Sequence, residues 1–149
     1  MLPDWIALCR LFNAHGVEYL LVGGQAVIVH GYPRLTRDMD LWVRPTTGNG
    51  ARVLLALAEF GAAPEGIGPE QFEDPRTLLM LGREPFRIDI LTDLPGVTFG
   101  EAWSLRIHVT LDEVTVPVIG KAQLITNKRA VARLQDLADA EELEKLDEL

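Results

Sequence analysis

Two aspartates separated by one residue, Asp38 and Asp40, are the strongest candidates for chemistry in this sequence. They lie in a stretch whose alternating apolar residues predict a β-strand over 37–43. Side chains two residues apart on a strand point to the same face, so the two carboxylates should lie side by side. Aspartate is unfavourable in strands, and neighbouring carboxylates repel each other unless a cation lies between them. The pair therefore predicts a divalent-metal site.

A third carboxylate is expected from a second strand, because a centre that holds two metal ions needs more than two acidic ligands. The segment 86–91 predicts such a strand, in which Arg87, Asp89 and Leu91 share one face. An acid inside an apolar strand is costly unless it is paired or metal-bound. We expect Asp89 to complete the set. Asp93 has the same parity but lies at the end of the strand, and it is the alternative.

A glycine pair, Gly23-Gly24, follows an apolar strand predicted over 18–22 and precedes a short helix predicted over 25–30. Glycine lets backbone N–H groups approach a phosphate, and the start of a helix favours negative charge. The pair is not part of a P-loop or a dinucleotide-binding fingerprint, because the lysine and the further glycines of those motifs are absent. A phosphate cradle beside a metal site indicates nucleotide chemistry.

Taken together, the glycine pair, the Asp-x-Asp pair and the later aspartate resemble the DNA polymerase β-like nucleotidyltransferase superfamily. The segment 19–43 is similar to the small, stand-alone bacterial members, which include relatives of the AbiEii-type toxin nucleotidyltransferases. The segments 124–128 and 133–139 resemble the closing motif of that group, so the resemblance covers most of the chain. It implies a nucleotidyltransferase fold and transfer of a nucleotide from an NTP to a hydroxyl or phosphate acceptor.

The resemblance also implies roles for individual residues. Asp38, Asp40 and Asp89 would hold two Mg²⁺ ions, and Asp89 would also help to activate the acceptor as a base. The β- and γ-phosphates would bind at the glycine pair. Further nucleotide-binding residues are expected near them, with Lys128 foremost because it belongs to the element that resembles the triphosphate-facing part of the family: Gly23, Gly24, Arg34, Thr36, Arg37 and Lys128.

Two departures from the commoner pattern concern the identity of the substrate. Glycine replaces the serine that often follows the first glycine, and Gln25 comes next. Gln135 occupies a place where the relatives often carry a basic residue.

Several other residues have a structural and a functional interpretation. Arg133 and Asp136 are three residues apart and are expected to pair with each other. Trp42 shares the face of the aspartates, so it either stacks on a base or is buried against a helix. We expect Cys9 to be a buried, inert thiol and the acidic run 136–148 to be a solvated helix face.

The elements predict an α+β (α/β) fold in which helices pack on a mixed β-sheet. A single domain is expected over 1–149, with a C-terminal helical element at about 121–146. The segment 45–50 should be a turn, and the glycine- and proline-rich segment 62–75 is the candidate for a mobile loop. The remaining predicted helices are 3–13, 51–60, 99–103, 121–125 and 130–146, and the remaining strands are 77–81, 107–111 and 114–118.

Composition narrows the class of protein. The chain has 149 residues, a net charge of −8 and one cysteine. The acidic balance argues against a broad nucleic-acid-binding face, although a local basic groove would still admit RNA. The sequence contains no apolar run long enough for a membrane span, no signal-peptide pattern and no pair of cysteines, so we expect a cytoplasmic protein.

Alternatives of different classes stay open at this point. The acceptor could be RNA, a protein or a small molecule, as in a toxin-like enzyme or an antibiotic nucleotidyltransferase. A non-catalytic module that binds a nucleotide or a partner would share the same motifs. A homodimer formed through 51–60 or the last helix, or an antitoxin partner, would complete a site in so small a domain.

Overall fold

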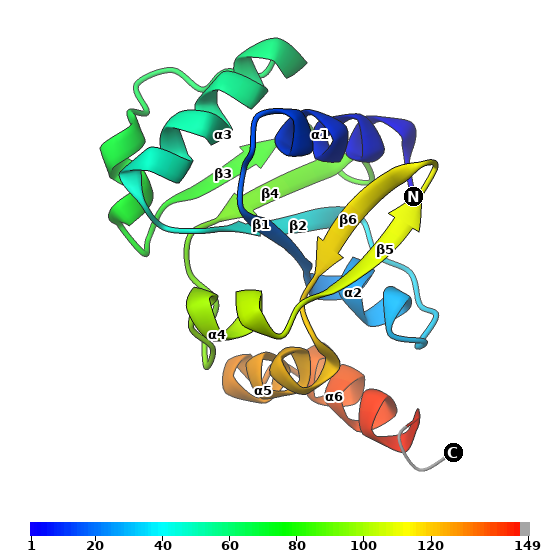
Figure 1. Cartoon of the computed structure of the whole chain (residues 1–149). Coiled ribbons are helices and arrows are strands. Elements are labelled where there is room, and N and C mark those ends of the chain that lie inside the picture. Colours follow the sequence, from blue (N-terminus) through cyan, green and yellow to red (C-terminus); the bar gives the residue numbers. More distant parts are fainter. Residues whose placement is uncertain (147–149) are drawn as a thin grey trace.

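The computed structural model describes residues 1–146. Within these residues, six strands form one mixed sheet in the order β3-β4-β2-β1-β6-β5 (Figure 1). The sequential neighbours β3 and β4, β1 and β2, and β5 and β6 pair antiparallel, whereas β4 with β2 and β1 with β6 pair parallel. The strands are β1 (Tyr19–Val22), β2 (Asp38–Val43), β3 (Leu78–Leu81), β4 (Arg87–Leu91), β5 (Ile107–Leu111) and β6 (Val114–Val118).

Helices cover the sheet on both sides. The helices α1 and α3 lie together on one side, and α5 and α6 form a pair on the other side, near α2 and α4 (Figure 1). This arrangement confirms the predicted mixed sheet with helices packed on it. The helices are α1 (Pro3–Ala14), α2 (Gly23–Val29), α3 (Thr47–Phe60), α4 (Phe99–Ser104), α5 (Lys121–Val131) and α6 (Leu134–Leu146), with a 3₁₀ helix η1 at Pro69–Glu73.

The central strands are buried because helices cover both of their faces. All four residues of β1 are buried, as are the apolar residues of β2. Trp42 packs edge-on against Phe99 of α4, with 5.0 Å between ring centroids, so it belongs to the core and does not offer a free face to a base. Cys9 is buried as expected, and burial raises the pKa of its thiol to about 12.

The helix expected at 51–60 begins earlier, at Thr47, so the predicted turn over 45–50 is wrong. The side chain of Thr46 caps the helix by accepting a hydrogen bond from the backbone N–H of Asn49. The Asn49 side chain is buried and donates to the carbonyls of Glu18 and Arg44. The cap and these bonds outweigh the low helix propensity of the two glycines in the first turn.

The segment 62–75, the candidate for a mobile loop, is attached to the fold in its second half. Its 3₁₀ helix places Phe72 in the core, fully buried against Gly50 of α3. The hydroxyl of Thr77 donates to the carbonyl of Gln71, and that of Thr92 donates to the carbonyl of Asp74. These contacts hold residues 69–75 against the core, and the mobility of 62–75 stays a prediction.

The two C-terminal helices also divide differently from the prediction. The expected helices 121–125 and 130–146 are replaced by α5, which continues to Val131, and α6, which begins at Leu134. The chain breaks between them at Ala132, whose φ is +60°. The backbone N–H and the guanidinium of Arg133 both donate to Asp136, which stabilises the start of α6. Within residues 1–146, no helix is both long and apolar enough to cross a bilayer.

Candidate functional site

The three predicted aspartates meet at the start of the parallel pair formed by β2 and β4. Asp40 and Asp89 are register partners, and Asp38 lies two residues before Asp40 on the same face. One carboxylate oxygen from each of the three residues lies within 4.8 Å of the others. Asp89, and not Asp93, therefore completes the cluster.

Burial and mutual repulsion dominate the electrostatics of this cluster. Burial raises the pKa of Asp40 to about 8, and the charge of Asp38, a hydrogen bond with Asp38 and the charge of Asp89 add to the rise. Burial also raises the pKa of Asp89, although the Arg87 guanidinium opposes that shift. The cluster thus favours a cation or a proton between its carboxylates.

The donor set fits a divalent metal ion. Carboxylate oxygens are the ligands that Mg²⁺ and Mn²⁺ prefer, and several carboxylates from adjacent strands can hold them. Asp89 supplies a second indication, because its buried Oδ1 has no hydrogen-bond partner. Arg87 Nε lies 3.0 Å from this oxygen without the alignment of a hydrogen bond, so the lone pairs of Oδ1 are available to a bound ion. Asp38, Asp40 and Asp89 could therefore hold a metal.

Arg87 lies inside this cluster, which the sequence analysis did not anticipate. Its Nη2 donates to Asp38 Oδ2 at 3.1 Å and to Asp89 Oδ2 at 3.2 Å. Its Nε lies 3.0 Å from Asp89 Oδ1 without the alignment of a hydrogen bond. The alternation of side chains along the strand already placed Arg87 on the face of Asp89, and this was the feature of the sequence that could have indicated its contact with Asp89. The contact with Asp38 depends on the register that pairs Asp38 with Arg87.

The glycine pair forms the first turn of α2, directly beside the aspartates. Val22 is the register partner of Asp40, so the chain turns into α2 next to that carboxylate. Gly23 has a φ of +67°, and a Cβ on it would collide with the carboxylate of Asp40. A Cβ on Gly24 would lie 2.7 Å from Thr36 Oγ1. Only glycine fits at both positions, and the N–H groups of a first helical turn lack helical partners.

The connection between α2 and β2 carries the three polar residues expected near the nucleotide. Thr36 Oγ1 donates toward the backbone carbonyl of Asp38 at 3.3 Å and its carboxylate at 3.4 Å, so it orients that aspartate. Arg37 is largely exposed and lies 3.8 Å from Glu84. Arg34 is partly buried, and it forms a two-point ion pair with Asp139 of α6 at 2.8 and 2.9 Å.

The facing wall comes from α5 and α6. Lys128 is buried, and its Nζ lies 3.2 Å from Asp136 and 3.1 Å from Asp139. Arg133 pairs with Asp136 at 2.7 Å, as the spacing predicted. Burial raises the pKa of Asp136, but hydrogen bonds from Arg133 and Lys128 outweigh it and lower the pKa below the ordinary value.

Two members of the acidic run on α6 are therefore internal counter-ions, which corrects the prediction of a solvated helix face. Asp136 is 1% exposed and Asp139 is 0% exposed. Gln135 supports the arrangement, because its amide donates to Asp139 at 2.9 Å. The sequence feature that could have indicated this role is the spacing of three residues between Asp136 and Asp139, which places both on one helix face.

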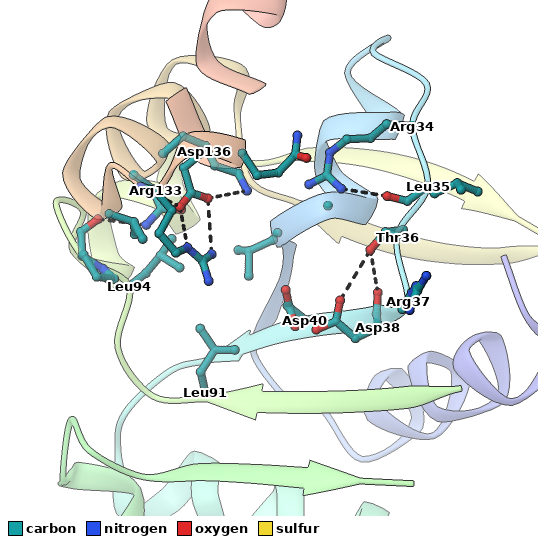
Figure 2. Close-up of a pocket in the computed structure, with 18 of the residues that line it drawn as sticks. Arg34, Leu35, Thr36, Arg37, Asp38, Asp40, Leu91, Leu94, Arg133 and Asp136 are labelled. Atoms are coloured by element: carbon teal, nitrogen blue, oxygen red, sulfur yellow. Dashed lines mark hydrogen bonds and ion pairs between the residues drawn. The ribbon is translucent and has the colours of Figure 1, made fainter. Parts of the chain in front are cut away.

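Two cavities meet at Asp38 and Asp40. The larger, of about 460 Å³, lies between the glycine turn, the connection before β2 and the α5–α6 wall. Figure 2 shows Asp38 and Asp40 on β2 at the base of this space, with Arg133 and Asp136 across from them. All predicted site residues except Asp89 line it: Gly23, Gly24, Arg34, Thr36, Arg37, Asp38, Asp40 and Lys128.

The second cavity, of about 400 Å³, lies toward β3 and β4 and includes Asp89 and Arg87. The two cavities adjoin each other, because they share five lining residues: Asp38, Asp40, Leu91, Asp93 and Arg133. Asp93 lines both cavities but lies outside the three-carboxylate cluster.

Comparison with solved structures finds a match along almost the whole chain. The crystal structure of the lincosamide antibiotic adenylyltransferase LnuA, with lincomycin bound, superposes with a TM-score of 0.57. The match covers 97% of this chain and 96% of that chain, at 16% sequence identity. No protein-family model and no curated protein matches the sequence.

The likeness confirms the expected fold: this chain has a nucleotidyltransferase fold built on a mixed sheet. At 16% identity it shows the fold alone. The expected kinship with AbiEii-type toxins receives no support from this likeness, because the structure compared is that of an antibiotic adenylyltransferase.

Proposed function

We propose that this protein is a Mg²⁺-dependent nucleotidyltransferase, which transfers the nucleoside monophosphate part of an NTP to an acceptor hydroxyl. The observation that carries the proposal is the meeting of three carboxylates with a cation-lined cavity beside a glycine turn. This combination suits a triphosphate bound with a metal ion. The fold shared with an adenylyltransferase adds support.

In the proposed mechanism, the NTP occupies the larger cavity with its phosphates toward Gly23 and Gly24. Mg²⁺, held by Asp38, Asp40 and Asp89, would neutralise the charge that develops on the attacking and leaving oxygens. The ion pairs with α6 fix the positions of the cationic side chains at this cavity, and the wall carries a net positive charge toward the triphosphate because three cations share two carboxylates: Arg34, Lys128 and Arg133 against Asp136 and Asp139. Thr36 holds the Asp38 carboxylate in place.

The acceptor would enter through the second cavity, because that cavity contains Asp89. Asp89 would accept the proton of the attacking hydroxyl, and burial, which raises the pKa of its carboxyl above the ordinary value, makes it a stronger base. Asp38, Asp40, Asp89 and Asp93 all line this cavity, while Arg87 and Arg133 are engaged in ion pairs. This charge distribution favours a neutral or cationic small molecule over the polyanionic backbone of RNA.

The lincosamide adenylyltransferase has a small-molecule ligand, lincomycin, so small hydroxylated compounds are the first acceptors to test. Incubation with an α-labelled NTP and Mg²⁺ should transfer label to one member of a panel of hydroxylated amines. Transfer of label to tRNA or to a protein would instead support a toxin-like activity. Binding of NTP without release of pyrophosphate, whatever the acceptor, would identify a non-catalytic binding module.

The first test is calorimetric titration of the four NTPs in the presence and absence of Mg²⁺. We expect one or more NTPs to bind only with the metal, and Asp38→Asn/Asp40→Asn to abolish this binding. Asp112→Asn is the matched control, because Asp112 lies in the turn between the distant strands β5 and β6. Absence of binding by the wild-type protein would reject the proposed function.

A further inference from the structure

The carboxylate cluster contains its own cation. The guanidinium of Arg87 lies between Asp38 and Asp89, and it contacts both within 3.2 Å. Its side chain is only 25% exposed, so solvent screens these interactions weakly. In the fully ionised cluster, three carboxylates and one guanidinium leave a net charge of −2, which a single divalent ion neutralises.

The same contacts place Arg87 in competition with a metal ion. The Nη2 and Nε atoms of Arg87 approach both oxygens of Asp89, and Nη2 also reaches Oδ2 of Asp38. An ion bound by all three aspartates would compete with Arg87 Nη2 for the Oδ2 atoms of Asp38 and Asp89, and the positive guanidinium repels a second cation at this distance. By contrast, Asp40 has no contact with Arg87 among the ion pairs of the described residues.

Arg87 also has another carboxylate within reach. Glu84, in the turn between β3 and β4, places its Oε1 3.6 Å from Arg87 Nη1, and its side chain is 48% exposed. A short movement toward Glu84 would let Arg87 keep an ionic partner while it releases Asp89. Glu84 in this turn therefore provides the alternative ion-pair partner that a displaced guanidinium would need.

We propose that Arg87 is the internal counter-ion of the three-aspartate cluster, that it limits the nucleotide-free protein to one divalent ion, and that a second ion binds only when Arg87 leaves Asp89 for Glu84. This inference rests on the metal site of the proposed function and adds its regulation. Arg87 acts through Asp38 and Asp89, so it is a positioning residue. The negative charge of a bound triphosphate would favour the second ion and would thereby drive the exchange.

The test is a titration of the nucleotide-free protein with Mn²⁺, in which electron paramagnetic resonance measures the concentration of unbound Mn²⁺. Wild type should bind one equivalent. Arg87→Gln removes the charge and should bind Mn²⁺ about tenfold more tightly or bind a second equivalent. Arg87→Lys keeps the charge but lacks the planar guanidinium that contacts both carboxylates. Its affinity for Mn²⁺ should therefore lie between that of wild type and that of Arg87→Gln. If Arg87 had only a structural role, Arg87→Gln would instead bind Mn²⁺ more weakly than wild type.

Arg76→Gln is the matched control, because Arg76 lines the same cavity but pairs with Asp74 outside the cluster. Its Mn²⁺ binding should equal that of wild type. Unchanged or weaker Mn²⁺ binding by folded Arg87→Gln would overturn the proposal. If Arg87→Gln does not fold without metal, Arg87→Lys decides the matter: a rise in affinity supports the proposal, and an unchanged affinity overturns it.

Thermal unfolding provides a second readout. In EDTA, Arg87→Gln should unfold at a lower temperature than wild type, because its carboxylates lose their counter-ion. Mn²⁺ should then raise the unfolding temperature of Arg87→Gln by more than that of wild type, and equal increases would contradict the proposal. Tighter Mn²⁺ binding by Arg87→Gln in a protein that binds no NTP would support Arg87 as counter-ion and reject nucleotidyl transfer. Metal-dependent NTP binding by wild type, with unchanged Mn²⁺ binding by Arg87→Gln, would support the proposed function and reject Arg87 as counter-ion.

Discussion

The backbone of Gly23 lies directly against the carboxylate of Asp40, because Val22, the residue before the glycine, is the register partner of Asp40. The turn that would hold phosphates and the strand that would hold the metal are therefore in van der Waals contact. A substitution at Gly23 therefore tests the phosphate-binding turn and the metal site together.

Gly23→Ala should lower the affinity for NTP by more than about tenfold and should also lower the unfolding temperature. A left-handed φ costs an alanine about 1 kcal/mol, and the added Cβ would also push Asp40 out of position. Gly66→Ala is the control, because Gly66 has a similar φ of +73° and nothing within 4 Å of its Cβ position. It should lower stability slightly and leave NTP binding unchanged, as measured by calorimetry. Equal effects of the two variants on NTP binding would show that the contact with Asp40 is irrelevant.

Metal affinity should depend on pH through Asp40. The pKa of Asp40 is raised to about 8 in the metal-free protein, so metal binding below that pH must displace a proton. The affinity for Mg²⁺ should rise by up to about tenfold per pH unit from pH 6 to pH 8 and then level off. Calorimetry at a series of pH values measures this slope. Asp40→Asn should bind Mg²⁺ weakly with a much flatter pH dependence, and a steep slope in that variant would assign the proton to another group.

The same shift has a consequence for stability in EDTA. Between an unfolded pKa near 4 and a folded pKa of about 8, the folded protein holds a proton that the unfolded chain has lost. The free energy of unfolding should therefore decrease as the pH rises through this range. Asp40→Asn should remove part of this decrease and be more stable than wild type at pH 9. Urea titrations at pH 6 and pH 9 would show it, and identical pH dependence in the two proteins would refute it.

Asp139→Asn should destabilise the protein by about 3 kcal/mol, because it removes the charge that neutralises buried Lys128 and partly buried Arg34. Urea unfolding measures this difference. Glu142→Gln is the control on the same helix, since Glu142 pairs with Lys145 at the surface. That change should stay within about 0.5 kcal/mol. A similarly small effect of Asp139→Asn would mean that α6 is held by its apolar contacts alone.

Phe72→Ala should destabilise the protein by about 3–4 kcal/mol, since it leaves a cavity where a fully buried ring packs against Gly50. Residues 69–75 should also become sensitive to limited proteolysis, which wild type should resist. Leu55→Ala is the comparison, because Leu55 is a large apolar residue that is 60% exposed, and its loss should cost less than about 1 kcal/mol. Rapid cleavage of wild type within 69–75 would show that this part of the segment is mobile.

Local sequence patterns predicted the parts of the site that depend on local geometry. The period of two along a strand correctly placed Asp38 and Asp40 on one face, and the glycines correctly marked the turn after β1. Arg87 was on the right face by the same rule. Its contact with Asp38 required the register between β2 and β4, which a 43-residue connection containing α3 and β3 determines, and no local pattern encodes that register.

The errors have a common physical origin in tertiary packing. Asp136 and Asp139 resemble surface acids until α6 packs on α5 and brings them to Lys128. The early start of α3 depends on Thr46 as a cap and on Asn49 bonding to Glu18, just before β1. The attachment of 69–75 depends on one buried ring. In each case a few long-range contacts outweighed the local preference.

The two adjoining cavities at Asp38 and Asp40 have a kinetic consequence for the proposed transfer. Because the NTP and the acceptor would occupy different cavities that share these aspartates, both substrates can be bound at the same time. We therefore expect direct transfer within a ternary complex, without a nucleotidylated enzyme that waits for its second substrate. Initial rates measured at several fixed acceptor concentrations should therefore give intersecting double-reciprocal lines, where a double-displacement reaction would give parallel ones.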